Sequence, residues 1–116
     1  SVNIQINNAG LEQYTTAGAS LDINAETTSI VVINAQDVNF IINTPTGTPN
    51  DGQKLLFRMI DDGNASIVKT ITWSAIYEPI GVTLPTNLTA SKLLYVGCIY
   101  NSNSGKWDVI AVTEQA

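Results

Sequence analysis

Apolar and polar residues alternate in short segments along this chain, and clusters of turn residues separate the segments every ~8–12 residues. Residues 2–7 show the clearest alternation, with Val2, Ile4 and Ile6 separated by asparagine and glutamine. Residues 29–34 include successive apolar positions, which predicts a strand in the interior of a sheet. No segment shows a convincing helical period. The pattern predicts an all-β fold, a β-sandwich or jelly roll of roughly eight to ten short strands in a single domain.

Two hairpins form the predicted centre of this fold. The first spans residues 54–73 and the second spans residues 93–112, each with a glycine-containing turn in its middle. We predict that Phe57 and Trp107 are largely buried, because apolar residues lie two positions away from each of them. Cys98 lies inside an apolar run, so we expect a small buried side chain there.

The chain divides into an N-terminal arm, residues 1–8, and a sandwich domain, residues 9–116. The arm alternates cleanly, but the sequence offers no obvious hairpin partner for it. Such a strand needs a partner for its edge, either in this chain or in a neighbouring subunit, whose sheet edge it can join through backbone hydrogen bonds. We therefore expect Val2, Ile4 and Ile6 to lie at an interface between subunits.

Charged residues are sparse in this chain. They make up 13% of its 116 residues, and the net charge is −5. The five basic residues are scattered, whereas nucleic acids and anionic membranes are bound by clustered basic residues. No apolar run approaches the ~20 residues of a membrane span. We expect neither nucleic acid nor a membrane as a partner, and the low charge suits close packing of copies in a homo-oligomer.

Candidate catalytic and metal-binding groups are few. The chain has no histidine and a single cysteine, and it lacks a glycine-rich phosphate loop, so we expect neither an enzyme nor a cofactor. Residues 61–64 (DDGN) offer oxygen ligands for calcium, but they lack the full spacing of a calcium loop and fit a hairpin turn better. Tyr77 lies in a proline-containing connection, where we expect an exposed ring that could contact a glycan, although aromatic residues of β-proteins more often pack in the core.

Several short runs in the last two thirds of the chain occur in a distinctive order. They are residues 49–55 (PNDGQKL), 71–73 (ITW), 84–85 (LP), 94–97 (LYVG), 99–101 (IYN) and 106–111 (KWDVIA). This order resembles a small β-sandwich domain of tailed-bacteriophage virion proteins, of the capsid decoration or cement type and of the tail-fibre or appendage type. The family pattern has no catalytic signature to transfer, and its recurring residues are turn glycines and core aromatics.

The resemblance implies a structural protein of the virion. The chain shows neither a coiled coil nor repeats, which favours a capsid decoration or cement protein that binds other virion subunits as a homo-oligomer, with a trimer expected. The alternative is a tail-fibre or appendage tip that binds a host-surface glycan. The chain begins with serine and shows no signal peptide, so we expect a complete protein that is made in the host cytoplasm and incorporated into the virion.

Overall fold

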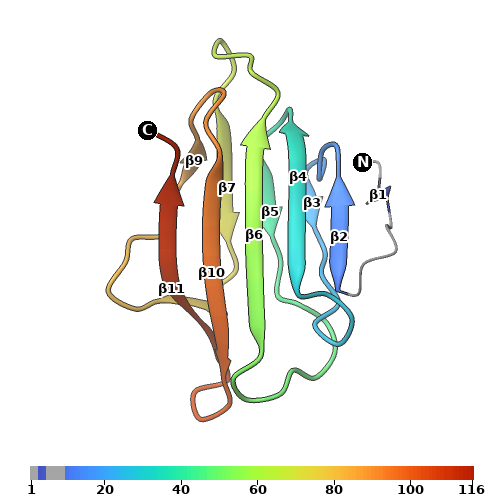
Figure 1. Ribbon diagram of the computed structural model, residues 1–116, viewed down its shortest axis with the longest axis vertical. Helices are drawn as coiled ribbons and strands as arrows, with labels where there is room; N and C mark the ends of the chain where they lie inside the picture. Colours follow the sequence, from blue (N-terminus) through green and yellow to red (C-terminus); the bar gives the residue numbers. More distant parts are fainter. Residues whose placement is uncertain (1–2, 5–9) are drawn as a thin grey trace.

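The computed structural model describes residues 3–4 and 10–116, which form β-strands and no helix (Figure 1). The strands are β1 (Asn3–Ile4), β2 (Leu11–Tyr14), β3 (Ser20–Leu21), β4 (Ile30–Gln36), β5 (Phe40–Ile42), β6 (Lys54–Asp61), β7 (Lys69–Trp73), β8 (Tyr77–Pro79), β9 (Asn87–Leu88), β10 (Leu94–Asn101) and β11 (Lys106–Glu114). They make a seven-stranded larger sheet in the order β1-β2-β4-β6-β10-β11-β8 and a four-stranded smaller sheet in the order β3-β5-β7-β9. The sheets share one core, which confirms the predicted single-domain β-sandwich. No helix long and apolar enough to cross a membrane occurs in these residues.

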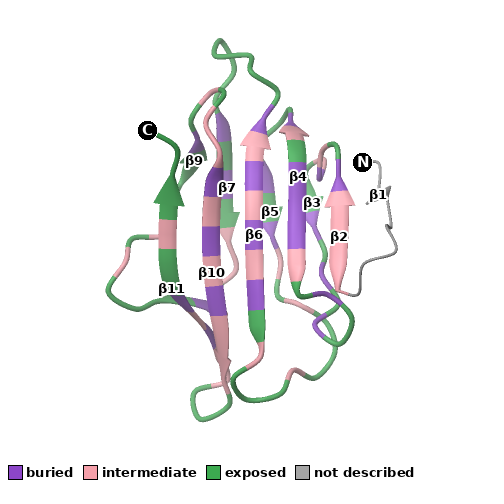
Figure 2. Ribbon diagram, viewed as in Figure 1, coloured by how far each residue is buried: buried purple, intermediate pink, exposed green. Residues whose placement is uncertain are grey.

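Side chains between the two sheets form the core. Along β6 and β10, buried residues alternate with less buried ones (Figure 2). Phe57 in β6 is 0% exposed and Trp107 in β11 is 2% exposed, and Cys98 in β10 is also buried, as the sequence predicts. Residues 31–33 of β4 are buried on both faces, and β4 lies inside the larger sheet between β2 and β6. Their apolar run therefore identified an interior strand correctly.

One of the two predicted hairpins is confirmed and the other is wrong. β10 and β11 are antiparallel neighbours joined by a short turn, as expected. β6, in contrast, lies in the larger sheet between β4 and β10, whereas β7 lies in the smaller sheet between β5 and β9. Residues 62–68 therefore carry the chain from one sheet to the other. Alternation shows that each strand buries one face, but it does not show which strand it pairs with.

The short runs singled out in the sequence meet in space. Gly52 has a φ of 80°, and its N–H donates to the carbonyl of Tyr100 at 2.9 Å. The N–H of Tyr100 donates to the carbonyl of Gln53 at 2.8 Å. The indole N–H of Trp73 donates to the carbonyl of Pro85 at 2.8 Å. The first two bonds attach the loop at residues 49–53 to β10, and the third attaches the connection before β9 to β7. The residues of these runs therefore have a structural role.

Of the predicted arm, residues 1–8, the structure describes residues 3 and 4. These form β1, which pairs antiparallel with residues 13–14 of β2 at one edge of the larger sheet. The strand therefore has a partner in its own chain, one of the two possibilities that the sequence left open. Val2 and Ile6 lie outside the described residues, and the interface role of Val2, Ile4 and Ile6 stays a prediction.

Candidate functional site

Tyr77, the predicted glycan contact, is buried. It begins β8 beside Trp107, and only 3% of its surface is exposed. Its ring packs edge-on against Phe57 and Trp73, with centroid distances of 6.1 and 5.2 Å. Its hydroxyl donates to the carbonyl of Asn43 at 3.2 Å, and burial raises the pKa of this hydroxyl well above its usual value. The prediction of an exposed Tyr77 is wrong, because the proline-containing connection forms an edge strand that directs the ring into the core.

The acidic segment at residues 61–64 surrounds a positive charge, which is the ammonium group of Lys69. Lys69 Nζ lies 3.3 Å from Asp61 Oδ2 and 2.7 Å from Asp62 Oδ1. It also donates to the carbonyl of Asn64 at 2.6 Å. The Lys69 side chain is 0% exposed, and a charge that is removed from water in this way requires such partners. Because β6 ends at Asp61 and β7 begins at Lys69, the ion pair joins the two sheets at one end of the sandwich.

Hydrogen bonds stabilise the charged forms of this cluster. Burial raises the pKa of Asp61, but the N–H groups of Ser91 and Gly63, at 2.8 and 3.0 Å, donate to its carboxylate. Together with Lys69 they hold the pKa of this carboxyl below its usual value. Burial lowers the pKa of Lys69, but Asp62 and Asp61 outweigh burial and raise it. Both groups stay charged at neutral pH, so the cluster is a structural crosslink.

The described residues bring no group of three or more histidine, cysteine, aspartate or glutamate side chains together as metal ligands. Cys98 is buried, and burial raises the pKa of its thiol to about 12. A thiol with this pKa stays protonated at neutral pH, whereas the thiolate is the nucleophilic form. Cys98 therefore acts as a small core side chain.

The larger sheet has an outer face, directed away from the smaller sheet, that carries a row of apolar residues. Register partners lie on the same face of a sheet. The row consists of Leu11, Ile30, Leu56, Gly97 and Ala111, which are partners across β2, β4, β6, β10 and β11. The solvent face of a sandwich is ordinarily polar, so this partly exposed apolar row makes the outer face a candidate binding surface.

A hollow of about 230 Å³ interrupts this row at Gly97. A Cβ atom at Gly97 would lie 3.5 Å from Ala111 Cβ and 3.9 Å from Leu56 Cδ1, so the hollow is the space that a side chain there would occupy. The register of β10 and β11 shifts at this point, which leaves Ile110 without a partner and 49% exposed beside the hollow. The lining residues of this Gly97 hollow are Lys54, Leu55, Leu56, Gly97, Cys98, Ile99, Ile110 and Ala111.

The outer face also carries basic residues, two of them in β6. Lys54 and Arg58 alternate with the buried residues of β6 and therefore point outward, and Lys54 lines the Gly97 hollow. Asp108 shares this face, and its carboxylate accepts a hydrogen bond from Asn101 Nδ2 at 3.2 Å. A chain with a net charge of −5 thus places the positive charge of Lys54 beside the apolar side chains of the hollow.

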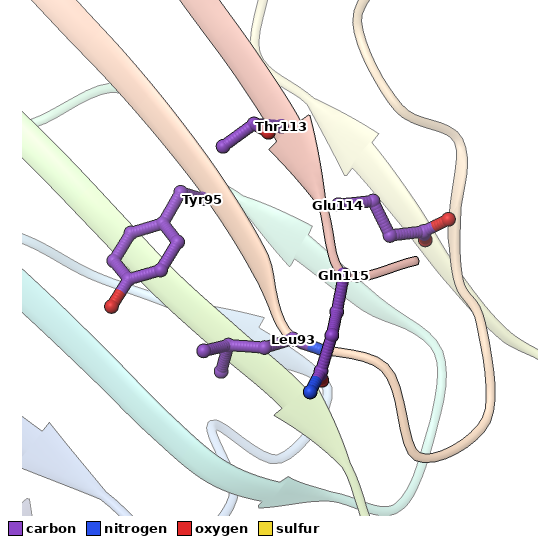
Figure 3. Close-up of a pocket in the computed structure, with 5 residues that line it drawn as sticks. All are labelled: Leu93, Tyr95, Thr113, Glu114 and Gln115. Carbon is purple, nitrogen blue, oxygen red and sulfur yellow. The ribbon is translucent and has the colours of Figure 1, made fainter.

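A second pocket, of about 250 Å³, lies where β10 begins and β11 ends (Figure 3). Leu93, Tyr95, Thr113, Glu114 and Gln115 line it. Tyr95 and Thr113 are register partners on the outer face, and Tyr95 is half-buried. The N–H of Leu93 donates to Gln115 Oε1 at 3.0 Å, and the N–H of Gln115 donates to the carbonyl of Leu93 at 2.8 Å. These bonds fasten the end of β11 to β10.

Sequence reasoning did not find the outer face or the Gly97 hollow. The usable signal was a glycine inside the strand pattern of residues 94–99, because a glycine in a strand often marks a close approach by a ligand or another backbone. Comparisons of the chain with protein-family models and with curated proteins give no match. The outer face and the ordered motifs of residues 49–111 therefore carry the functional interpretation.

Proposed function

We propose that this protein is a structural component of a tailed-bacteriophage virion, specifically a capsid decoration or cement protein. It docks onto other virion subunits through the outer face of its larger sheet. We infer this docking mode from the apolar row of the outer face and the Gly97 hollow that interrupts it. The bacteriophage assignment is supported by the resemblance of residues 49–111 to virion β-domains.

The chemistry of the outer face defines the partner surface. The Gly97 hollow accepts an apolar side chain, whose burial contributes about 1.5–3 kcal/mol. Lys54 and Arg58 favour carboxylates around that side chain, since complementary charges speed and orient docking. The bound surface is therefore an apolar projection with acidic neighbours on a capsid subunit.

Binding to capsids tests the proposal directly. Purified protein is added in increasing amounts to capsids that lack it, and bound copies are counted after sedimentation. We expect saturable binding at many copies per capsid. Failure to bind capsids, combined with binding to host cells at a few copies per virion, would replace this function with receptor recognition.

Filling the hollow separates docking from folding. Gly97 has no positive φ, and its neighbours are at ordinary contact distance, so Gly97→Leu is compatible with the fold. We expect about 10- to 100-fold weaker capsid binding, which corresponds to the loss of one buried apolar side chain. Thr72→Leu is the matched control, because Thr72 is exposed on the smaller sheet and points away from the core. Equal binding by both variants would exclude the outer face as the docking surface.

The alternative function is a tail-fibre or appendage tip that binds a host-surface glycan. Its predicted contact, Tyr77, is buried. The observation in its favour is the pocket of Figure 3, where half-buried Tyr95 lies on the same face as Thr113 and Gln115 also lines the pocket, while the Glu114 side chain points to the other side of β11. Binding to a panel of host-surface glycans, compared between the wild type and Tyr95→Ala, distinguishes this alternative from capsid decoration.

A further inference from the structure

One sheet edge is much longer than the others in the described part of the chain. The edge strands β1, β3, β8 and β9 have two or three residues each, and β8 ends at Pro79. Short edges and prolines are the means by which proteins prevent edge-to-edge association. β8 pairs with residues 107–109 of β11, and no strand in the described part of the chain pairs with residues 110–114 on that side. This five-residue stretch is the open edge of β11.

The backbone groups on the open edge can be assigned from the pairing with β10. The N–H of Gln115 donates to the carbonyl of Leu93, and hydrogen-bonded pairs alternate along an antiparallel ladder. Thr113 and Ala111 therefore bond to β10, whereas the N–H and C=O groups of Val112 and Glu114 point away from it. Within the described residues, none of these four groups makes a hydrogen bond. Residues 110, 111, 113 and 114 are exposed and residue 112 is half-buried, so the stretch is open to solvent.

We propose that a second copy of this chain binds along the open edge of β11, antiparallel and related by a two-fold axis at Thr113. In this register Val112 of each copy lies opposite Glu114 of the other. Each such pair exchanges two N–H···O=C bonds, so the two symmetric pairs satisfy all four free groups of each strand. The larger sheets of the two copies then form one continuous sheet. The proposal does not depend on the virion assignment.

The open edge of one copy is complementary to the open edge of a second copy, both in the spacing of its free backbone groups and in the side chains that would face each other. Its free groups lie on alternate residues placed symmetrically about Thr113, which is the condition for self-pairing. Thr113 faces Thr113 of the other copy, a favourable cross-strand pair. Glu114, the charged residue of the stretch, lies opposite Val112 of the other copy and not opposite a second carboxylate. Like charges directly opposite each other, which would oppose pairing, are thereby avoided.

The pairing also changes the outer face. Tyr95 and Thr113 are register partners, so the two copies together form a row of Tyr95, Thr113, Thr113 and Tyr95 across the junction. The pockets of Figure 3 come side by side at this junction. Two Gly97 hollows then belong to one rigid surface, and linked sites bind a repetitive surface more tightly than single sites do.

Mass measurement and amide exchange test the dimer. The full chain is studied by sedimentation equilibrium between about 1 μM and about 1 mM, concentrations that cover weak to moderate association. We expect a monomer–dimer equilibrium, with the amide protons of Val112 and Glu114 exchanging more slowly in the dimer when followed by NMR. A species that is monomeric throughout overturns the proposal. A trimer, the state expected from the sequence, also overturns it, because two-fold pairing at a single edge closes as a dimer.

A proline at the open edge supplies the decisive variant. Glu114→Pro removes an N–H that makes no bond within the described residues of the same copy, whereas Glu114→Ala removes the carboxylate and retains the N–H. We expect Glu114→Pro to weaken dimerisation by about tenfold or more relative to Glu114→Ala, because two symmetric hydrogen bonds are lost. Equal dimerisation of the two variants overturns the proposal. Slow amide exchange that appears only on binding to capsids assigns the edge to another protein and also overturns it.

Discussion

Truncation of Trp107 is the most direct test of the core. Trp107 is 2% exposed, and its ring packs edge-on against Tyr100 with a centroid distance of 5.2 Å. Its backbone N–H donates to the carbonyl of Ile76, so the residue also fastens β11 to the connection before β8. Replacing a buried tryptophan with alanine removes the packed ring and leaves a cavity, which costs about 3–5 kcal/mol.

This cost can be converted into a melting temperature. Unfolding entropy is ~2.1 cal/mol/K per residue, which gives about 0.24 kcal/mol/K for 116 residues. A loss of 3–5 kcal/mol therefore lowers the midpoint of Trp107→Ala by about 12–20 °C. Thermal unfolding followed by circular dichroism measures the midpoint of the wild type and of the variant.

Ile110→Ala is the matched control for this measurement. Ile110 lies in the same strand and is 49% exposed, so its truncation should change the free energy of unfolding by much less than that of Trp107. If Trp107→Ala melts within about 2 °C of the wild type, a shift of less than about 0.5 kcal/mol, the tryptophan does not support the core. If Trp107→Ala does not fold, Trp107→Phe retains an aromatic ring and should give an intermediate midpoint.

Three further predictions concern the ionisable groups. The folded pKa of Asp61 is depressed, so its contribution to stability is fully present above the unfolded pKa of ~3.9 and is lost as the pH falls through the folded pKa. Asp61→Asn should therefore be less stable than the wild type at pH 7 and approach it in acid. A difference in melting temperature that does not change with pH would contradict this. EDTA should leave the melting temperature unchanged, because the Lys69 ammonium lies within ion-pair distance of both Asp61 and Asp62. A large drop that calcium reverses would show a metal site. Iodoacetamide should alkylate Cys98 slowly in the folded protein and rapidly in denaturant, because burial raises the thiol pKa to about 12; equal rates would place the thiol at the surface.

Lys69 illustrates how much structural information the local sequence pattern contained. Alternation in β7 places Lys69 on the same face as Ile71 and Trp73, the face that the core covers. The pattern therefore contained the signal for an inward lysine, and Asp61 and Asp62 precede it by a few residues. Only the folded chain shows that these carboxylates meet the ammonium, because the ion pair connects two strands that lie in different sheets.

The sequence alone determined those features that depend on a few neighbouring residues. Alternation assigned Phe57 and Trp107 to the core, and an apolar run assigned Cys98 to it. The short turn after residue 101 specified the β10–β11 hairpin. Both are local: a strand on a core buries every second side chain, and a short turn brings adjacent strands together.

The tertiary structure decided everything that depends on distant segments. It separated β6 from β7, directed Tyr77 into the core, paired β1 with β2 and left the Gly97 hollow and the edge of β11 open. Strand partners are chosen by the packing of the whole core, since a strand with one apolar face can satisfy its backbone groups against several neighbours. A surface remains open only where no other segment of the chain reaches it, and this is a property of the assembled fold and not of any single stretch of residues.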